Sequence, residues 1–507
     1  MTAGILILLV FIAAAVSMFL RKLPALLAVP LMAIAIGLVE VITGKLSFQD
    51  VLLVVVADGS QRLIEPIIIS ILSGAVSLLM QKSGVAESLI KTGAELAGSN
   101  PFVVSLVVFA VVGLLFTTIG GLGAVIMVAT IVLPILGSVG LREQAAGGIL
   151  LLGISFGGLL NVNNWAAYKT VLSISPERIS SYALILFLIQ IPIAVLFIGY
   201  ELWRARSLHI RVSKIVISFL LLGAAALAIW VSSPVWSRIT PEGFHATLEW
   251  MTGVFGGAAL LFIVIDKIRA FRTRDEDAVR WYSYLIPVVP LILVLVYQVH
   301  FVSSFVLAFF YGIIATLRKR SIQLATRSVI DGGASVIPVI ILMLGIGMLL
   351  SAILGPTKFG AGAAWYEKTA GLAAANGGAA NGPTAWPVLA DMRPLLESVV
   401  PTSFWNYVFG FALLAPLALY RGPMNVWGLG YGVAGVLLST GQLPAAAIMG
   451  ILMSLSIVQG ICDPTNTHNV WLANELRVDV NALMWRTLPY AWLAAFFGLL
   501  AAAIKFL

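Results

Sequence analysis

The sequence contains few charged residues and almost no cysteine. Charged residues make up 10% of its 507 positions, whereas about 25% is usual in a soluble globular domain. The single cysteine, Cys462, excludes a disulfide within the chain and any metal site built from several cysteines. The four histidines show no metal-ligand spacing. We therefore expect a protein outside the soluble class, with no resident metal or cofactor.

Nucleotide-binding and hydrolase motifs are also absent. The chain has no phosphate-binding loop, no zinc motif and no G-x-S-x-G turn, so it encodes no primary pump. Its 30 Lys and Arg residues against 22 Asp and Glu residues give a net charge of +8. In a chain this apolar, a basic excess orients loops at a membrane and does not indicate a nucleic-acid partner.

Apolar residues are abundant: they make up 60% of the sequence, and the mean hydropathy is +1.05. The 47 glycines and 22 prolines lie mostly within apolar stretches, as in membrane helices that pack closely or break. This composition predicts an all-α polytopic protein of the lipid bilayer. The apolar segments cover residues 4–20, 24–42, 63–81, 102–118, 124–138, 145–160, 182–201, 215–231, 246–266, 283–299, 301–317, 334–354, 403–420, 424–438, 445–460 and 488–506.

The arrangement of these segments predicts two inverted halves. Segment 4–20 has no preceding charge and is followed by Arg21 and Lys22, which indicates a membrane helix with its N-terminus outside rather than a cleaved signal. The basic clusters at 21–22, 204–214, 267–280 and 318–320 can then all lie inside, as expected in a cytoplasmic (inner) membrane. The predicted units are a first inverted repeat, 1–203; connecting helices and basic loops, 204–281; and a second inverted repeat, 282–507, with an external loop at 355–400.

Polar breaks recur in the same order in both halves. Gly121 precedes Gly140 by 19 residues, and Gly422 precedes Gly441 by 19. An Asn-rich break with a tryptophan follows in each half, at 161–166 and at 463–473, and a helix-start signal comes after each break. Because several apolar segments are shorter than the roughly 20 residues that span a bilayer, we predict broken helices or re-entrant hairpins at these positions.

Breaks at membrane depth are expected to line a cavity, because lipid cannot satisfy the freed N–H and C=O groups. The residues predicted to bind substrate are Thr117, Thr118, Gly120, Gly121, Gly123, Asn161, Asn163, Asn164, Arg421, Asn425, Thr465, Asn466 and Thr467. The residues predicted to bind or carry a coupling ion are Asp463, His468 and Asn469.

The chemistry of these side chains suits an anion and a cation. Arg421 stands between two apolar runs, where a charge costs about 2.5–3.5 kcal/mol, and its paired N–H donors suit a carboxylate. Asp463 and His468 can carry a proton, whereas Asp and Asn oxygens suit Na⁺. Structural alternatives stay open: a flexible kink at 117–123, a polar cap at Asn161, an ordinary turn at Arg421 and a helix cap at Asp463.

Three stretches resemble the ion transporter superfamily, and within it the citrate–metal and gluconate-type permeases. They are residues 19–28, the run 120–140 with its Leu133-Pro134-Ile135, and the run 463–492. The resemblance implies inverted repeats, broken or re-entrant elements, a midplane site, coupling to Na⁺ or H⁺, and a homodimer. The Ser-Asn-Thr signatures of the sodium–dicarboxylate branch are replaced by residues 119–121 and 421–423, so the resemblance does not select Na⁺ over H⁺ or a dicarboxylate over other organic anions.

The sequence therefore predicts a secondary active transporter, not an enzyme, that moves a small organic anion by alternating access coupled to H⁺ or Na⁺. An alternative is a Na⁺/H⁺-type antiporter, in which Asp463 and His468 act and Arg421 is structural. A membrane glycopolymer ligase or polymerase is a further alternative. Such enzymes usually carry catalytic charged residues in a large external loop, and here residues 355–400 are mostly Gly and Ala.

Overall fold

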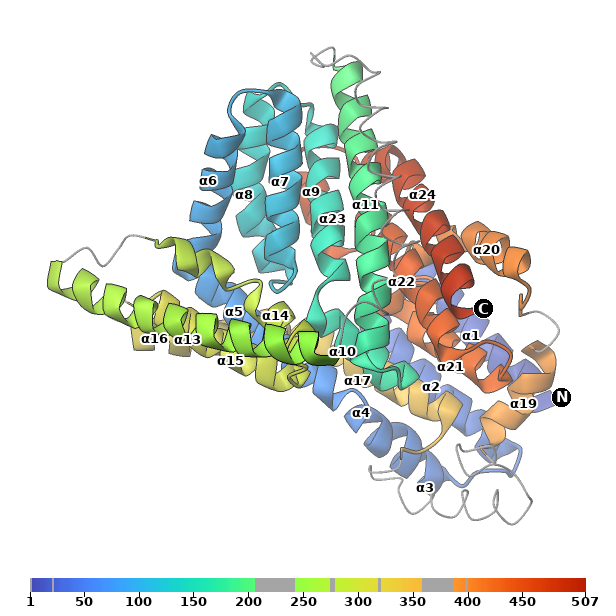
Figure 1. Ribbon diagram of the computed structural model, residues 1–507. Coiled ribbons are helices and arrows are strands. Elements are labelled where there is room, and N and C mark those ends of the chain that lie inside the picture. Colours follow the sequence, from blue (N-terminus) through green and yellow to red (C-terminus); the bar gives the residue numbers. More distant parts are fainter. Residues whose placement is uncertain are drawn as a thin grey trace.

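The computed structural model describes residues 2–20, 22–205, 242–273, 279–317, 321–357, 386–396 and 400–507, and all regular structure within these ranges is helical (Figure 1). This confirms the predicted all-α fold. Outside the described residues lie the predicted segment 215–231, most of the predicted loop 355–400, and the basic residues Arg21, Arg206, Arg211, Lys214, Arg274, Arg318, Lys319 and Arg320.

Six helical stretches in the described part are long and apolar enough to cross a bilayer, so the chain is a multi-pass membrane protein. A seventh span is added if the bent pair Glu143–Leu159 and Val162–Leu172 is counted as one. The six are Ala25–Ile42, Phe48–Lys82, Pro176–Arg204, Ile337–Leu354, Ala445–Glu475 and Val480–Phe506.

The first half of the chain runs through hairpins and a broken helix to one long helix. Its elements are α1 (Thr2–Phe19), α2 (Ala25–Ile42), α3 (Phe48–Asp50), the π-helix η1 (Val51–Asp58), α4 (Gly59–Gln61), α5 (Ile64–Lys82), α6 (Val85–Ala97), α7 (Pro101–Phe116), α8 (Leu122–Ser138), α9 (Glu143–Leu159), α10 (Val162–Leu172) and α11 (Pro176–Arg204).

The second half ends in a similar order. Its elements are α13 (Glu242–Thr273), η2 (Trp281–Leu285), α14 (Val289–Leu295), α15 (Phe301–Ala315), α16 (Ser321–Ser335), α17 (Ile337–Leu354), α19 (Pro387–Leu396), α20 (Phe404–Leu413), η3 (Ala415–Ala418), η4 (Val426–Gly430), α21 (Tyr431–Thr440), α22 (Ala445–Cys462), α23 (Thr467–Glu475) and α24 (Val480–Phe506).

One long span differs from the sequence-based prediction. The apolar segment predicted to begin at 63 instead belongs to a 35-residue span, Phe48–Lys82, that contains Asp58 and Arg62. Both side chains are bound to the segment that follows α17: Asp58 accepts hydrogen bonds from the N–H and hydroxyl of Thr357, and Arg62 donates to the carbonyl of Gly355. Pairing with a distant segment is what allows these residues inside an apolar span.

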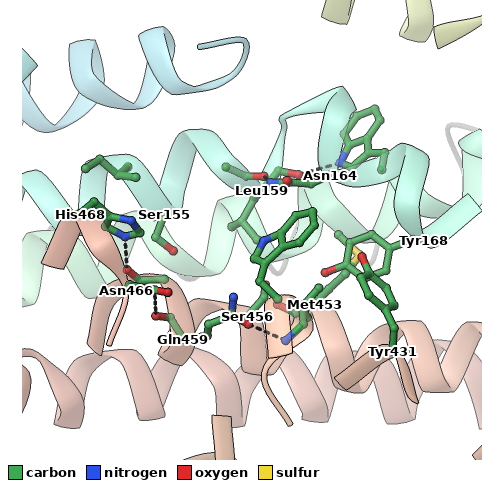
Figure 2. Close-up of a pocket in the computed structure, with 16 residues that line it drawn as sticks. Ser155, Leu159, Asn164, Tyr168, Tyr431, Met453, Ser456, Gln459, Asn466 and His468 are labelled. Atoms are coloured by element: carbon green, nitrogen blue, oxygen red, sulfur yellow. Dashed lines mark hydrogen bonds between the residues drawn. The ribbon is translucent and has the colours of Figure 1, made fainter. Parts of the chain in front are cut away.

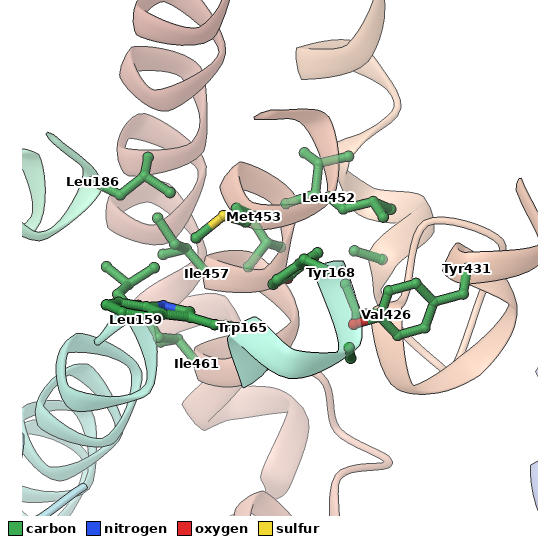
Figure 3. Packing of buried hydrophobic residues seen from close by; sticks show 14 of the residues in the cluster. Leu159, Trp165, Tyr168, Leu186, Val426, Tyr431, Leu452, Met453, Ile457 and Ile461 are labelled. Atoms are coloured by element: carbon green, nitrogen blue, oxygen red, sulfur yellow. The ribbon is translucent and has the colours of Figure 1, made fainter. Parts of the chain in front are cut away.

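The hairpin α7–α8 packs closely against α9, the first part of the broken helix α9–α10 (Figure 1). A Cβ added to Gly157 of α9 would lie 2.2 Å from the carbonyl oxygen of Gly113 on α7, so only glycine permits this approach. The interior next to the break is apolar: Figure 3 shows Trp165, which is fully buried, near Ile457 and Ile461 of α22. The fold therefore holds α9 between α7 on one side and α22 on the other.

Candidate functional site

The first break separates α9 from α10 and bends them by 53°. Asn161 lies at the break and caps α10, because its side-chain oxygen accepts a hydrogen bond from the N–H of Asn163 at 3.0 Å. Its side-chain nitrogen donates to the carbonyl of Phe116, the last residue of α7, at 3.0 Å. Asn161 therefore joins the broken helix to the end of the neighbouring hairpin helix.

The carbonyls freed at the end of α9 are bound by side chains of α10. Asn164 donates from its amide nitrogen to the carbonyl of Gly158 at 2.8 Å, and the Trp165 indole N–H donates to the carbonyl of Leu159 at 2.8 Å. The break is thus satisfied by neutral groups, as an interruption in a membrane helix requires.

The second break, between α22 and α23, is built around the buried carboxylate of Asp463. Its Oδ1 accepts from the backbone N–H of Tyr420 at 2.9 Å and from the N–H and hydroxyl of Thr465 at 2.9 and 2.7 Å. Its Oδ2 accepts from the side-chain amide of Asn425 at 2.8 Å and the backbone N–H of Arg421 at 3.4 Å. One carboxylate thereby ties the loop before η4 to the break.

Side chains at the start of α23, including its N-cap residue Asn466, also bind carbonyls at the end of α22. Asn466 donates to the carbonyl of Gln459 at 2.8 Å, and Asn469 donates to the carbonyl of Asp463 at 2.9 Å. A ring nitrogen of His468, Nε2, lies 3.2 Å from the carbonyl oxygen of Gly460. In both halves, therefore, the short helix after the break binds the end of the helix before it.

A cavity of about 160 Å³ lies between the two breaks (Figure 2). Residues of α9–α10, of η4–α21 and of α22–α23 form its wall. The lining residues are Ile154, Ser155, Gly158, Leu159, Asn164, Trp165, Tyr168, Val426, Trp427, Tyr431, Met453, Ser456, Gln459, Gly460, Asn466 and His468.

No Lys, Arg, Asp or Glu lines this cavity in the described part of the chain, and His468 is the lining side chain that can acquire a positive charge. The remaining polar groups are amides and hydroxyls, such as those of Asn164, Ser155 and Ser456. The cavity therefore offers a small polar molecule neutral donors and acceptors.

Asn164, Asn466 and His468, all predicted from the sequence, line the cavity. The predicted residues Asn161, Asp463, Thr465 and Asn469 are not part of its lining, and their hydrogen bonds hold the two breaks in shape. Asn425 supports the same framework, because its amide nitrogen donates to the carbonyl of Ala418 as well as to Asp463.

Arg421, predicted to bind a carboxylate, lies in the loop before η4 and outside the cavity lining. Its guanidinium donates to the carbonyl of Trp427 at 2.9 Å, and its backbone has a φ of 56°. A Cβ added to Gly428 would lie 2.5 Å from the Arg421 carbonyl oxygen, so the turn is tight. In this conformation the guanidinium has an acceptor within the protein.

The predicted residues of the α7–α8 hairpin lie apart from the cavity. The hydroxyls of Thr117 and Thr118 both donate to the carbonyl of Pro287, in the first case at 2.9 Å. Gly120, Gly121 and Gly123 have no atom within 4 Å of an added Cβ, and Gly121 has a φ of +82°. The hairpin tip is therefore spacious, and only Gly121 there requires glycine for its backbone conformation.

Two further predicted residues lie outside the cavity lining. Asn163 faces α5, where its side-chain oxygen accepts from the hydroxyl of Ser70 at 3.0 Å. Thr467 is exposed at the start of α23.

Several cavity residues were not predicted, because they lie within regular helices. Tyr168, Tyr431, Ser456 and Gln459 belong to α10, α21 and α22, where no break marks them. The available signal was a polar side chain within an otherwise apolar helix, as at Gln459, whose side-chain oxygen accepts from the N–H of Val426 at 2.7 Å.

No family model matches the chain, and no curated protein matches it. Among solved structures, the chain is similar to the YdaH transporter of Alcanivorax borkumensis, whose crystal structure is described as revealing an unusual topology. The TM-score is 0.47 and the identity is 14%, over 87% of this chain and 86% of that chain. Similarity at this level leaves the function to be argued from the cavity and its surroundings.

Proposed function

We propose that the protein is a secondary active transporter of the cytoplasmic membrane that moves a small organic anion by alternating access, driven by a gradient of H⁺ or Na⁺. The observation that carries this proposal is the polar cavity of about 160 Å³ bounded by two broken helices. Broken helices within a membrane are tolerated where they surround a solute site, because the freed backbone groups then have partners.

The electrostatics of the breaks favour an anion. The short helices α10 and α23 begin at Val162 and Thr467, next to cavity residues Asn164 and Asn466. The N-terminal end of a helix carries a partial positive charge, which stabilises a nearby anion. An anionic group between these two helix starts would be attracted to both.

The order of elements supports inverted repeats. In the first half the hairpin α7–α8, the broken helix α9–α10 and the long helix α11 follow one another. In the second half α20–α21, α22–α23 and α24 follow in the same order. With the basic clusters inside, the N-terminus would lie outside the cell. A homodimer remains a proposal that comes from the superfamily resemblance.

Two coupling ions are chemically possible at the second break. His468 can carry a proton into the cavity that it lines. Alternatively, the side-chain oxygens of Asn425 and Asn469 are buried and have no hydrogen-bond partner among the described residues. Buried neutral oxygens of this kind suit Na⁺.

The alternative of a Na⁺/H⁺-type antiporter requires a carboxylate that is open to a cation. Asp463 already accepts hydrogen bonds from Tyr420, Arg421, Asn425 and both donors of Thr465. Donors surround both oxygens in this conformation, so the structure favours a positioning role for Asp463. The alternative of a membrane glycopolymer ligase or polymerase depends on catalytic residues in the loop 355–400. Most of this loop lies outside the described residues.

The test is uptake by proteoliposomes that contain the purified full-length protein. A panel of labelled small carboxylates would be offered with an inward H⁺ gradient, an inward Na⁺ gradient or neither. We expect accumulation of one class of carboxylate with only one of the two gradients, and its loss when an ionophore removes that gradient. Na⁺ movement driven by a pH gradient, without any carboxylate flux, would establish the antiporter instead.

A further inference from the structure

An ion pair lies within the membrane-spanning part of the molecule, apart from the cavity lining and from the two breaks. Glu65 on α5 is the middle residue of the 35-residue span Phe48–Lys82, and Lys169 belongs to α10. The Lys169 Nζ lies 2.8 Å from Glu65 Oε1 and 3.2 Å from Oε2, and both side chains are half-buried. A charge within a membrane span is costly, so an ionisable residue there usually has both a partner and a function.

The ion pair fastens α10 to α5. A second polar contact joins the same two helices, because the hydroxyl of Ser70 donates to the side-chain oxygen of Asn163 at 3.0 Å. Ser70 follows Glu65 on α5, whereas Asn163 precedes Lys169 on α10, so the two helices run antiparallel. The short helix α10 is therefore held against α5 near both of its ends.

The same short helix forms part of the cavity wall. Asn164, Trp165 and Tyr168 of α10 line the cavity, and Lys169 follows Tyr168 directly in the chain. Because α10 has 11 residues and moves as one rigid element, a shift of Lys169 relative to α5 also shifts Tyr168. The ion pair therefore sets the position of this wall.

Each member of the pair has a second partner at the start of α15. The Nε2 of His300 lies 3.3 Å from Glu65 Oε1, so the imidazole can donate to this carboxylate. The Lys169 Nζ lies 5.3 Å from the centre of the Phe301 ring, which is within the range of a cation–π interaction. Separating a buried ion pair is costly when a charge is left uncompensated. Here the pair can separate while each charge keeps a partner.

We propose that Glu65 and Lys169 are positioning residues for the cavity, and that their ion pair is the contact that opens when α10 moves. In the described conformation the pair holds α10 and its part of the wall in place. When the pair opens, Glu65 stays bound to His300 and Lys169 stays over the Phe301 ring. This inference rests on the proposed transport function, because alternating access requires the wall of the cavity to move.

The test measures how readily the cavity opens and needs no transported ligand. In a Cys462→Ser background, Ser456→Cys gives the chain a single thiol, in the part of the cavity wall that α22 contributes. N-Ethylmaleimide is added to the purified full-length protein, and mass spectrometry follows the rate of labelling. Glu65→Gln should raise this rate about tenfold, because the loss of one charge breaks a half-buried ion pair.

The matched control is Asp331→Asn. Asp331 of α16 pairs with Lys82 at 2.7 Å, and this exposed ion pair is attached to the other end of the same helix α5. Its removal should leave the labelling rate unchanged. A second comparison keeps the charge on α10: Lys169→Arg can still bind the carboxylate and should retain the slow rate, which Lys169→Gln should lose.

Labelling at the wild-type rate in Glu65→Gln or, if that variant fails to fold, in Lys169→Gln would overturn the proposal. An equal increase in Asp331→Asn would mean that any change on α5 loosens the protein, and equal rates for Lys169→Arg and Lys169→Gln would mean that charge is irrelevant. Either result would also overturn it. If labelling behaves as expected but no carboxylate is taken up by proteoliposomes, only the proposed transport function is wrong.

Discussion

Asn161 and Asp463 lie at the two breaks, and each side chain ties its broken helix to the hairpin or loop beside it. The first junction uses neutral groups only: the amides of Asn161 and Asn164 and the indole of Trp165. The second places a carboxylate at its centre, with Arg421 close to it. His468 lies on the neighbouring α23.

This chemical difference between the two junctions suits them to different roles. A junction of amides keeps the same charge at every pH that a cell experiences, so it can act as a constant framework. A junction with a carboxylate and an imidazole can change its charge state or bind a cation. If the proposed transport function holds, we therefore expect coupling to involve the second junction, while the first junction serves only as a framework.

The largest effect is expected from Asp463→Asn. The new amide would point one of its own N–H donors into a site where every neighbour is a donor, so hydrogen bonds would be lost and donors would repel one another. Disrupting a buried charged site in this way costs about 3–5 kcal/mol. Thermal unfolding in detergent, followed by tryptophan fluorescence, should show a large decrease in midpoint, and gradient-driven uptake should disappear.

The matched control is Asp479→Asn. Asp479 is exposed and caps α24 by accepting from the N–H groups of Asn481 and Ala482, a task that asparagine performs equally well. Its unfolding midpoint should stay close to that of the wild type. Equal effects of the two substitutions would mean that Asp463 is an ordinary cap and that the contrast between the junctions is wrong.

A second prediction compares helix packing at the two breaks. Gly157→Ala should destabilise the protein by about 1–3 kcal/mol, because the new methyl group would meet the Gly113 carbonyl at 2.2 Å. Gly460→Ala at the second break should be tolerated, since the closest atom to an added Cβ is the Ser155 hydroxyl at 3.8 Å. Unfolding midpoints of the pair would decide whether the first junction is the tightly packed one.

A third prediction concerns the link between the first break and its hairpin. Asn161→Ala removes both a helix cap and the hydrogen bond to Phe116, and should cost about 1–2 kcal/mol. Asn100→Ala removes a cap alone, at the start of α7, and should cost less. If Asn161→Ala lowered the free energy of unfolding more than Asp463→Asn does, the neutral junction would contribute more to stability than the junction around the carboxylate.

The smallest effect on stability is expected from His468→Gln, because glutamine can still bond to the Gly460 carbonyl. The effect of this substitution on transport distinguishes coupling to H⁺ from coupling to Na⁺. Uptake measured over a range of pH should lose its pH dependence if His468 carries the proton. Uptake that retains its pH profile and requires Na⁺ would point to the amide oxygens of Asn425 and Asn469 instead.

The sequence predicted the helix ends around both breaks well, because caps and prolines act locally. Pro176 begins α11, and Asp479 caps α24, as expected. The sequence could not show that Asp58 pairs with Thr357, which lies 299 residues away, so the predicted apolar segment begins at residue 63 and leaves out residues 48–62. Contacts between distant segments leave no local pattern.

The cavity was predicted only in part for the same reason. The polar breaks pointed to Asn164, Asn466 and His468, and these residues line the cavity. Tyr431 was missed, since its place depends on how α21 packs beside α10 and α22, which periodicity alone does not determine. The binding roles assigned to Thr117, Thr118 and Arg421 stay predictions, and the structure gives each of these side chains a protein acceptor.

On the proposed function, solute passes through the cavity between the two broken helices. The most direct measurement is uptake of the transported carboxylate by proteoliposomes that carry Gly460→Trp, which fills the cavity from its wall on α22. Gly137→Trp is the control, because Gly137 on α8 is exposed, away from the cavity, with nothing within 4 Å of an added Cβ. We predict that Gly460→Trp folds and does not transport, while Gly137→Trp transports normally. Wild-type uptake by a folded Gly460→Trp variant would contradict the claim.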